Sequence, residues 1–189
     1  IRGRNEEAQL AYRVARDLAQ SVVKQDPKRT DAHLVLARIW WRAGERTEAI
    51  AALQTVRRQE PGKLPVLREL LQVELLAGHD EQVSALVKKA LELNPDSPNN
   101  RIALLAILAT AQYRSGKSSL ARDSARHALE LARTQQGPLH FGDWQLPVLQ
   151  RQLKDRLSGD LHTLWQALGR WNLGEDGASL TEALRRLAD

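Results

Sequence analysis

The pattern of apolar positions along this chain predicts helices arranged in pairs. Between residues 30 and 61, two sets recur at three- and four-residue steps, the first being Leu36, Ala37 and Trp40 and the second Ala49, Leu53 and Val56. Because an α-helix has 3.6 residues per turn, each set lies on one face of an amphipathic helix. The next segment repeats the arrangement with Leu70, Leu71, Val83, Val87 and Ala90. The pattern therefore predicts two successive helical hairpins.

Proline and glycine mark the ends of these helices at a fixed interval. Pro27, Pro61 and Pro95 are 34 residues apart, and Gly44 and Gly78 each follow the preceding proline by 17 residues. Proline ends a helix because it has no N–H to donate, and glycine suits the turn after a helix. Each unit is therefore predicted to be a helix, a glycine turn, a second helix and a proline turn.

The segments on either side follow the pattern less closely. Gly116 comes 21 residues after Pro95, so the first helix of a third unit is predicted to be about one turn longer. Residues 5–24 are predicted to form the second helix of an earlier unit whose first helix is missing or replaced. After a loop around residues 135–142, three more helices are expected at about 143–157, 160–173 and 179–188, the last opening with a capping box from Ser179 to Glu182.

This 34-residue unit resembles the tetratricopeptide repeat family. The signature positions are occupied by Leu36, Ala37, Trp40, Gly44, Ala49, Leu53 and Pro61, with a weaker copy at Leu70, Gly78, Val83, Ala90 and Pro95 and a third at Leu108, Ala109, Gly116, Ala121, Ala125 and Ala128. The resemblance implies an all-α fold, a right-handed α-solenoid of antiparallel helix pairs with about three repeats and additional C-terminal helices. We expect residues 1–29 to be the second helix of an incomplete repeat, 30–133 to be the repeats, and 134–189 to be a loop and a C-terminal capping region or degenerate repeat.

The resemblance also implies a binding surface, because the first helices of stacked repeats line a concave groove that takes peptides or partner helices. In that frame the groove positions are Leu34, Arg38, Trp41, Arg42, Arg68, Gln72, Leu75, Thr110, Tyr113 and Arg114. Aromatic anchors and forked arginine donors suit an acidic-hydrophobic protein or peptide. Two alternatives stay open, namely that Trp41 packs against the next repeat and that the arginines are simply solvated. The tail tryptophans are predicted to be core residues: Trp144, Trp165 and Trp171.

Composition narrows the function further. The 189 residues include no cysteine, which excludes disulfides and thiolate chemistry, and the compartment stays open between cytoplasm and periplasm. The formal charge of +5 is spread among acidic residues without a basic stripe, so we expect no nucleic-acid partner. The longest apolar stretch, residues 102–111, is too short to span a bilayer. Because the chain starts at Ile1 and has no methionine, we interpret it as an internal fragment of a longer protein.

No catalytic or metal-binding pattern stands out. The five histidines are scattered at His33, His79, His127, His140 and His162, none of them in a metal-ligand spacing, and no glycine-rich phosphate loop occurs. We therefore expect no metal, no cofactor and no enzyme activity. The first hypothesis is an interaction scaffold; the alternative is a structural section of a longer bacterial envelope machine for polysaccharide export, pilus assembly or cytochrome maturation. An enzyme domain is the least favoured hypothesis, and the oligomeric state stays open.

Overall fold

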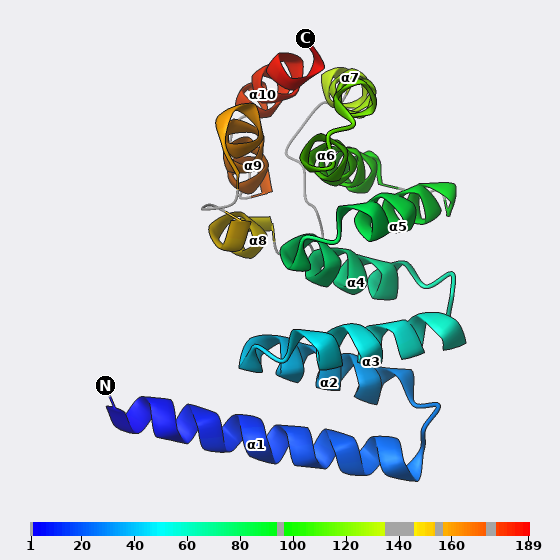
Figure 1. Cartoon of the computed structure of the whole chain (residues 1–189), viewed down its shortest axis with the longest axis vertical. Coiled ribbons are helices and arrows are strands. Elements are labelled where there is room, and N and C mark those ends of the chain that lie inside the picture. The colour runs from blue at the N-terminus through cyan, green and yellow to red at the C-terminus, as the bar shows by residue number, and fades with distance from the viewer. Residues whose placement is uncertain (1, 94–96, 135–145, 154–156, 173–176) are drawn as a thin grey trace. The chain divides into compact units, whose positions relative to one another are not determined.

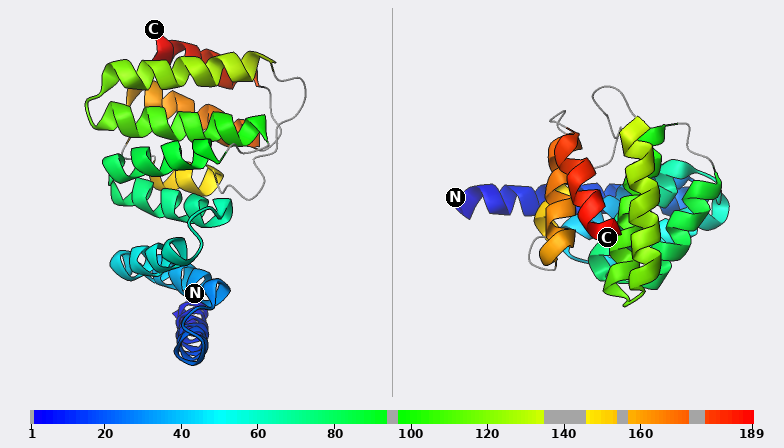
Figure 2. Two further views of the ribbon diagram at one scale, coloured as in Figure 1. Left: turned by 90° about the vertical axis from the view of Figure 1, so that its right-hand side faces the viewer. Right: turned by 90° about the horizontal axis from the view of Figure 1, so that it is seen from above.

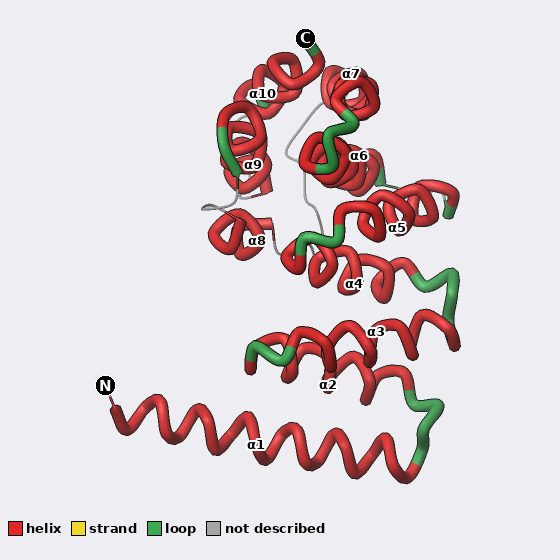
Figure 3. Tube along the Cα trace, viewed as in Figure 1, coloured by secondary structure: helices red, strands yellow, loops and turns green. Residues whose placement is uncertain are grey.

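A computed structural model describes residues 2–93, 97–134, 146–153, 157–172 and 177–189, which are helical apart from short connections (Figures 1 and 3). No strand occurs among these residues, so the all-α prediction is confirmed. The helices of the described chain are α1 (Arg2–Gln25), α2 (Thr30–Ala43), α3 (Arg46–Gln59), α4 (Leu64–Ala77), α5 (Asp80–Glu92), α6 (Pro98–Arg114), α7 (Ser118–Thr134), α8 (Leu146–Leu153), α9 (Gly159–Asn172) and α10 (Ala178–Ala188). The three predicted C-terminal helices are thus present.

The three predicted hairpins turn in the same way. Gly44, Gly78 and Gly116 have φ values of 85°, 84° and 76°, the left-handed region that glycine enters without a steric penalty. In each turn the glycine N–H and the following N–H donate to carbonyls of the last helical turn, as when Gly44 N donates to Trp41 O and Glu45 N to Trp40 O. This is the Schellman motif, repeated three times. The prediction of paired helices is therefore confirmed.

The third hairpin differs in length as the sequence predicts. Its first helix, α6, has 17 residues, whereas α2 and α4 have 14 each. Pro27 and Pro61 lie in the connections between hairpins, and Pro95 lies outside the described residues. The capping-box prediction is wrong, because α10 begins at Ala178 after Gly177 and leaves Ser179 inside the first turn.

The chain forms two compact units, unit 1 (residues 1–73) and unit 2 (residues 74–189). The boundary between them lies inside α4, whereas the sequence pattern predicts segment boundaries after residues 29 and 133. Repeat boundaries follow the sequence period and compact units follow packing, so the two divisions need not coincide.

Unit 1 is built around the packing of α2 between α1 and α3. On the α1 side, Ala19, Leu36 and Ile39 form a buried cluster, and Trp40 packs against it while staying half-buried. The small Ala19 side chain lets the two helices approach closely, and the larger α2 side chains fill the space beside it. On the other side, α3 buries its own apolar stripe: Ala49, Ala52, Leu53 and Val56.

Unit 2 surrounds α6 with other helices. α6 packs against α5, α7 and α9 (Figure 2). Every residue from 102 to 112 is buried, which explains why this helix is apolar on all sides. α10 packs against α7 and α9, and Arg126 on α7 donates to the carbonyl of Ala188 at 3.1 Å. Trp165 is 1% exposed, so its predicted core position is confirmed. Trp144 and the predicted loop at 135–142 lie outside the described residues, as does the side chain of Trp171.

Candidate functional site

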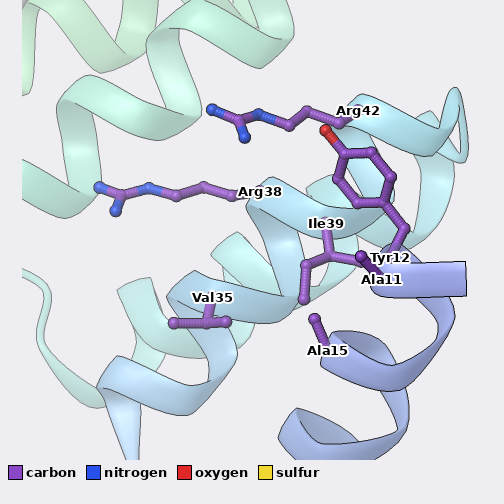
Figure 4. A pocket seen from close by; sticks show the side chains of 7 residues that line it. All are labelled: Ala11, Tyr12, Ala15, Val35, Arg38, Ile39 and Arg42. Carbon is purple, nitrogen blue, oxygen red and sulfur yellow. The ribbon is translucent and has the colours of Figure 1, made fainter. Parts of the chain in front are cut away.

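In unit 1, a cavity of about 600 Å³ lies between α1 and α2, here called the α1–α2 cavity. Its lining side chains are Ala11, Tyr12 and Ala15 from α1 and Val35, Arg38, Ile39 and Arg42 from α2 (Figure 4). Tyr12 is 38% exposed and Val35 is 46% exposed, which is unusual for large apolar side chains at a helix interface. The cavity therefore offers apolar contact surface to solvent.

Two arginines on successive turns of α2 give this cavity a positive rim. Figure 4 shows both side chains extending to the same side of α2. Arg38 is held by Glu69 on α4, with 2.5 Å between Nη2 and Oε1. Arg42 is exposed and has no hydrogen-bond or ion-pair partner among the residues that the structure describes. One guanidinium at the rim is thus available to a carboxylate from outside.

Unit 1 carries six of the predicted groove residues, and two of them meet at the α1–α2 cavity. Arg38 and Arg42 line it, whereas Leu34 is half-buried beside them on α2. Trp41 is also half-buried, and the Arg46 guanidinium lies 5.7 Å from the centre of its ring, within cation–π range. On α4, Arg68 and Gln72 are half-buried.

Unit 2 places two of the predicted groove residues in its interior, and at these positions the expected exposure is wrong. Leu75 and Thr110 are both fully buried. Thr110 is covered because Trp165 of α9 packs onto α6 and donates from Nε1 to the Thr110 hydroxyl at 3.0 Å. The predicted groove requires the first helix of the third repeat, α6, to be open to solvent. Instead, α9 covers it at Thr110.

The remaining two predicted residues of unit 2 differ in exposure. Tyr113 is 51% exposed and stays a surface residue. Arg114 is largely buried, pairs with Asp80 at 3.3 Å between Nε and Oδ2, and donates to the carbonyl of Leu75. These contacts join the end of α6 to the turn between α4 and α5, so Arg114 holds the hairpins together. A structural role therefore accounts for it.

The same turn holds a partly buried acid, Asp80. Burial raises the pKa of its carboxyl above the ordinary value, and the nearby charges of Arg114 and His79 oppose the shift. Beside it, His79 Nδ1 lies 2.6 Å from Oε2 of the buried Glu74. Within the described part of the chain, no group of three or more acidic and histidine side chains could hold a metal ion. His140 lies outside the described residues.

The sequence reasoning missed the contribution of α1 to this site. A second cavity of about 470 Å³, the outer α1 cavity, is lined by Glu7, Leu10, Ala11, Val14, Ala15 and Leu18. Leu10, Val14 and Leu18 are spaced four residues apart, so they form an apolar stripe along one face of α1. That spacing was visible in the sequence and could have identified the surface. In the described residues, no helix has the length and apolarity needed to cross a bilayer.

Comparison with known proteins finds a repeat family in the N-terminal part of the chain and similar folds over most of it. Residues 7–73 match a family model described as the tetratricopeptide repeat. The crystal structure of MamA is similar with a TM-score of 0.58 and 13% identity, covering 96% of this chain and 92% of MamA. A thermophilic TPR protein of Thermus thermophilus gives a TM-score of 0.50 at 20% identity, covering 98% of this chain and 95% of that protein.

An enzyme also appears among the similar structures. The O-GlcNAc transferase of Thermobaculum terrenum gives a TM-score of 0.51 at 21% identity, and the match covers 73% of this chain but 27% of the transferase. At such identities the likeness concerns the fold and carries no activity to this chain. No curated protein matches the sequence.

Proposed function

We propose, from the premise that this chain belongs to the tetratricopeptide repeat family, that it is a protein-interaction scaffold whose binding site is the α1–α2 cavity. Proteins with such repeats generally hold other proteins. The partner segment is apolar with at least one carboxylate, since the cavity combines an apolar lining with arginines at its rim.

The observation that carries this proposal is Arg42, which has no partner among the described residues. An exposed arginine on a solvated surface contributes little, but one at the edge of an apolar cavity is partly desolvated when a ligand covers it. A carboxylate that reaches it there makes a charge-assisted hydrogen bond of about 1.5–3 kcal/mol. The apolar lining gives contact area, and the arginine selects the acidic segment.

The test begins with affinity capture of binding proteins on the wild-type chain and on an Arg42→Glu variant. A protein that the variant fails to retain is then purified and titrated against both chains. We expect Arg42→Glu to weaken binding by about tenfold or more, because it replaces an attraction with a repulsion. Arg122 on α7 is also exposed, so Arg122→Glu is the matched control and should bind as the wild type does.

Two results would decide against this function. Equal affinity of the wild type and Arg42→Glu for every captured protein would remove the α1–α2 cavity as the binding site. An equal loss in Arg42→Glu and Arg122→Glu would mean that overall charge, not this site, attracts the partner. The hypothesis of a section in a bacterial envelope machine stays a prediction, tested by whether a captured partner belongs to such a machine.

A further inference from the structure

One position of the exposed stripe on α1, that of Leu18, is covered in the following repeats. Moving by 34 residues along the sequence takes Leu18 to Ala52 of α3, and a second step takes it to Leu86 of α5. Leu18 is 64% exposed, whereas Ala52 is 5% and Leu86 is 2% exposed. The same helical position is therefore buried in two hairpins and open in α1.

The missing cover has a local cause in the sequence. The same step relates Leu10 to Gly44, the glycine that turns the chain between α2 and α3 with a φ of 85°. A leucine at such a turn would strain the backbone, and α1 instead continues through residue 10 as one helix of 24 residues. The hairpin does not form at this position, so in unit 1 no first helix lies against the stripe.

The stripe is also more apolar than its counterpart in the next hairpin. Ala11 and Val14 of α1 correspond to Glu45 and Glu48, which are exposed near the start of α3. A face that simply remained in water would be expected to keep polar residues at these positions. Exposed alanine, valine and leucine there indicate a surface that is covered by another molecule.

The shape of this surface suits a helix. The α1–α2 cavity and the outer α1 cavity share Ala11 and Ala15, two small residues one turn apart that permit close approach of a backbone. On α2, Val35 and Arg38 correspond to Glu69 and Gln72 of α4, and Glu69 is the residue by which α4 contacts α2. The face of α2 at the cavity is thus the face that a neighbouring first helix uses within this chain.

We infer that the two cavities together hold one amphipathic helix of a partner protein, in the position of the missing first helix. This inference rests on the proposed function and specifies the form of the ligand. The partner helix presents apolar side chains to the α1 stripe and to Ile39, and a carboxylate on its flank to Arg42. A second copy of the chain fits less well, because a symmetric contact puts the same patch on both sides and this patch carries two arginines against one glutamate.

A peptide with the sequence of residues 64–77 is a suitable probe, since α4 is the helix that makes the equivalent contact with α2. It is synthesised with a fluorophore and a hydrocarbon staple on its solvent face, and binding to the full chain is measured by fluorescence anisotropy. A second peptide carries Leu71→Pro, which breaks the helix while keeping the charges. We expect the stapled helix to bind and the proline peptide to bind at least about tenfold more weakly.

Variants of the chain then locate the probe. Leu18→Asp should weaken binding of the stapled peptide by about tenfold or more, because it places a charge in the stripe that the peptide covers. Leu120 on α7 is 48% exposed, so Leu120→Asp is the matched control and should leave binding unchanged. Circular dichroism of Leu18→Asp should equal that of the wild type, because the side chain is exposed in the free protein.

The outcomes separate this inference from the proposed function. If Arg42→Glu weakens the probe but Leu18→Asp does not, or if the proline peptide binds as well as the helix, the α1–α2 cavity binds a segment and the helix inference is wrong. If neither variant weakens binding of the probe, or if the probe does not bind at about 500 µM, the result contradicts both the α1–α2 cavity as a binding site and the helix inference. Sedimentation showing a wild-type dimer that Leu18→Asp dissociates would identify a second copy as the occupant and overturn the inference.

Discussion

The contact between α9 and α6 gives a sharp test of the packing in unit 2. Trp165 and Thr110 lie 55 positions apart in the sequence, and both side chains are buried. The Trp165 N–H donates to the Thr110 hydroxyl, which in turn donates to the carbonyl of Ala106 at 2.8 Å. Thr110→Val preserves the shape of the side chain and removes both roles, leaving the indole N–H buried without an acceptor.

The expected cost follows from the burial. An unsatisfied buried donor costs about 1–3 kcal/mol, so Thr110→Val should lower the free energy of unfolding by that amount. A buried tryptophan removes about 150–250 Å² from water, which at about 25 cal/mol/Å² corresponds to about 4–6 kcal/mol. Trp165→Phe should lose part of this, because the smaller ring leaves a void and no N–H. In the double variant no indole N–H remains unsatisfied. Its loss of free energy of unfolding should therefore be about 1 kcal/mol smaller than the sum of the two single losses.

Urea unfolding followed by tryptophan fluorescence measures these costs. A background of Trp40→Phe and Trp41→Phe removes the signal of unit 1 and leaves the three tryptophans of unit 2. A cost below about 0.3 kcal/mol for Thr110→Val, or fully additive single variants, would show that the hydrogen bond is not part of the folded protein. In that case the explanation for the buried groove position would be refuted as well.

Two further predictions concern the turns. Gly44→Ala should lower the free energy of unfolding in urea by about 1–2 kcal/mol. A Cβ at this position meets no atom within 4 Å, so the cost comes from the left-handed backbone alone. An unchanged urea midpoint would contradict the positive φ of Gly44. Asp80→Asn tests the raised pKa of Asp80, whose folded carboxyl takes up a proton at higher pH than the unfolded one. The wild type should therefore gain stability relative to Asp80→Asn as the pH falls from about 7 to about 4, and a loss over this window would contradict the burial.

The sequence was most informative where a single residue decides the local structure. Gly44, Gly78 and Gly116 could be recognised as turns because few other residues enter the left-handed region cheaply, and the extra length of α6 followed from the position of Gly116. The repeat frame also fixes which face of α2 Arg38 and Arg42 occupy, and both line the α1–α2 cavity, while their role in binding stays a prediction.

The errors arose where contacts cross between repeats. Thr110 and Leu75 have the spacing of groove residues, and nothing in a 34-residue period indicates that Trp165 covers α6 from outside the repeats. Tertiary packing of this kind depends on where a later segment folds back, which local patterns do not encode. The α1 stripe falls outside the repeat pattern for a different reason, because a second helix at residues 5–24 is defined by the face that packs within its hairpin and the pattern does not specify its other face.

Surfaces that the chain covers in unit 2 stay exposed in unit 1, and this difference makes the N-terminal site the better candidate for binding. In unit 2 the chain covers Thr110 with its own α9 and buries Leu86, so the corresponding surfaces are satisfied internally. In unit 1 it leaves Leu18 exposed, places apolar residues where α3 carries glutamates, and keeps Arg42 without a partner among the described residues. An incomplete repeat would explain the exposure of Leu18 alone. It would not explain the change from glutamate to apolar residues beside an arginine that pairs with none of the described residues, and a covering partner helix accounts for all three.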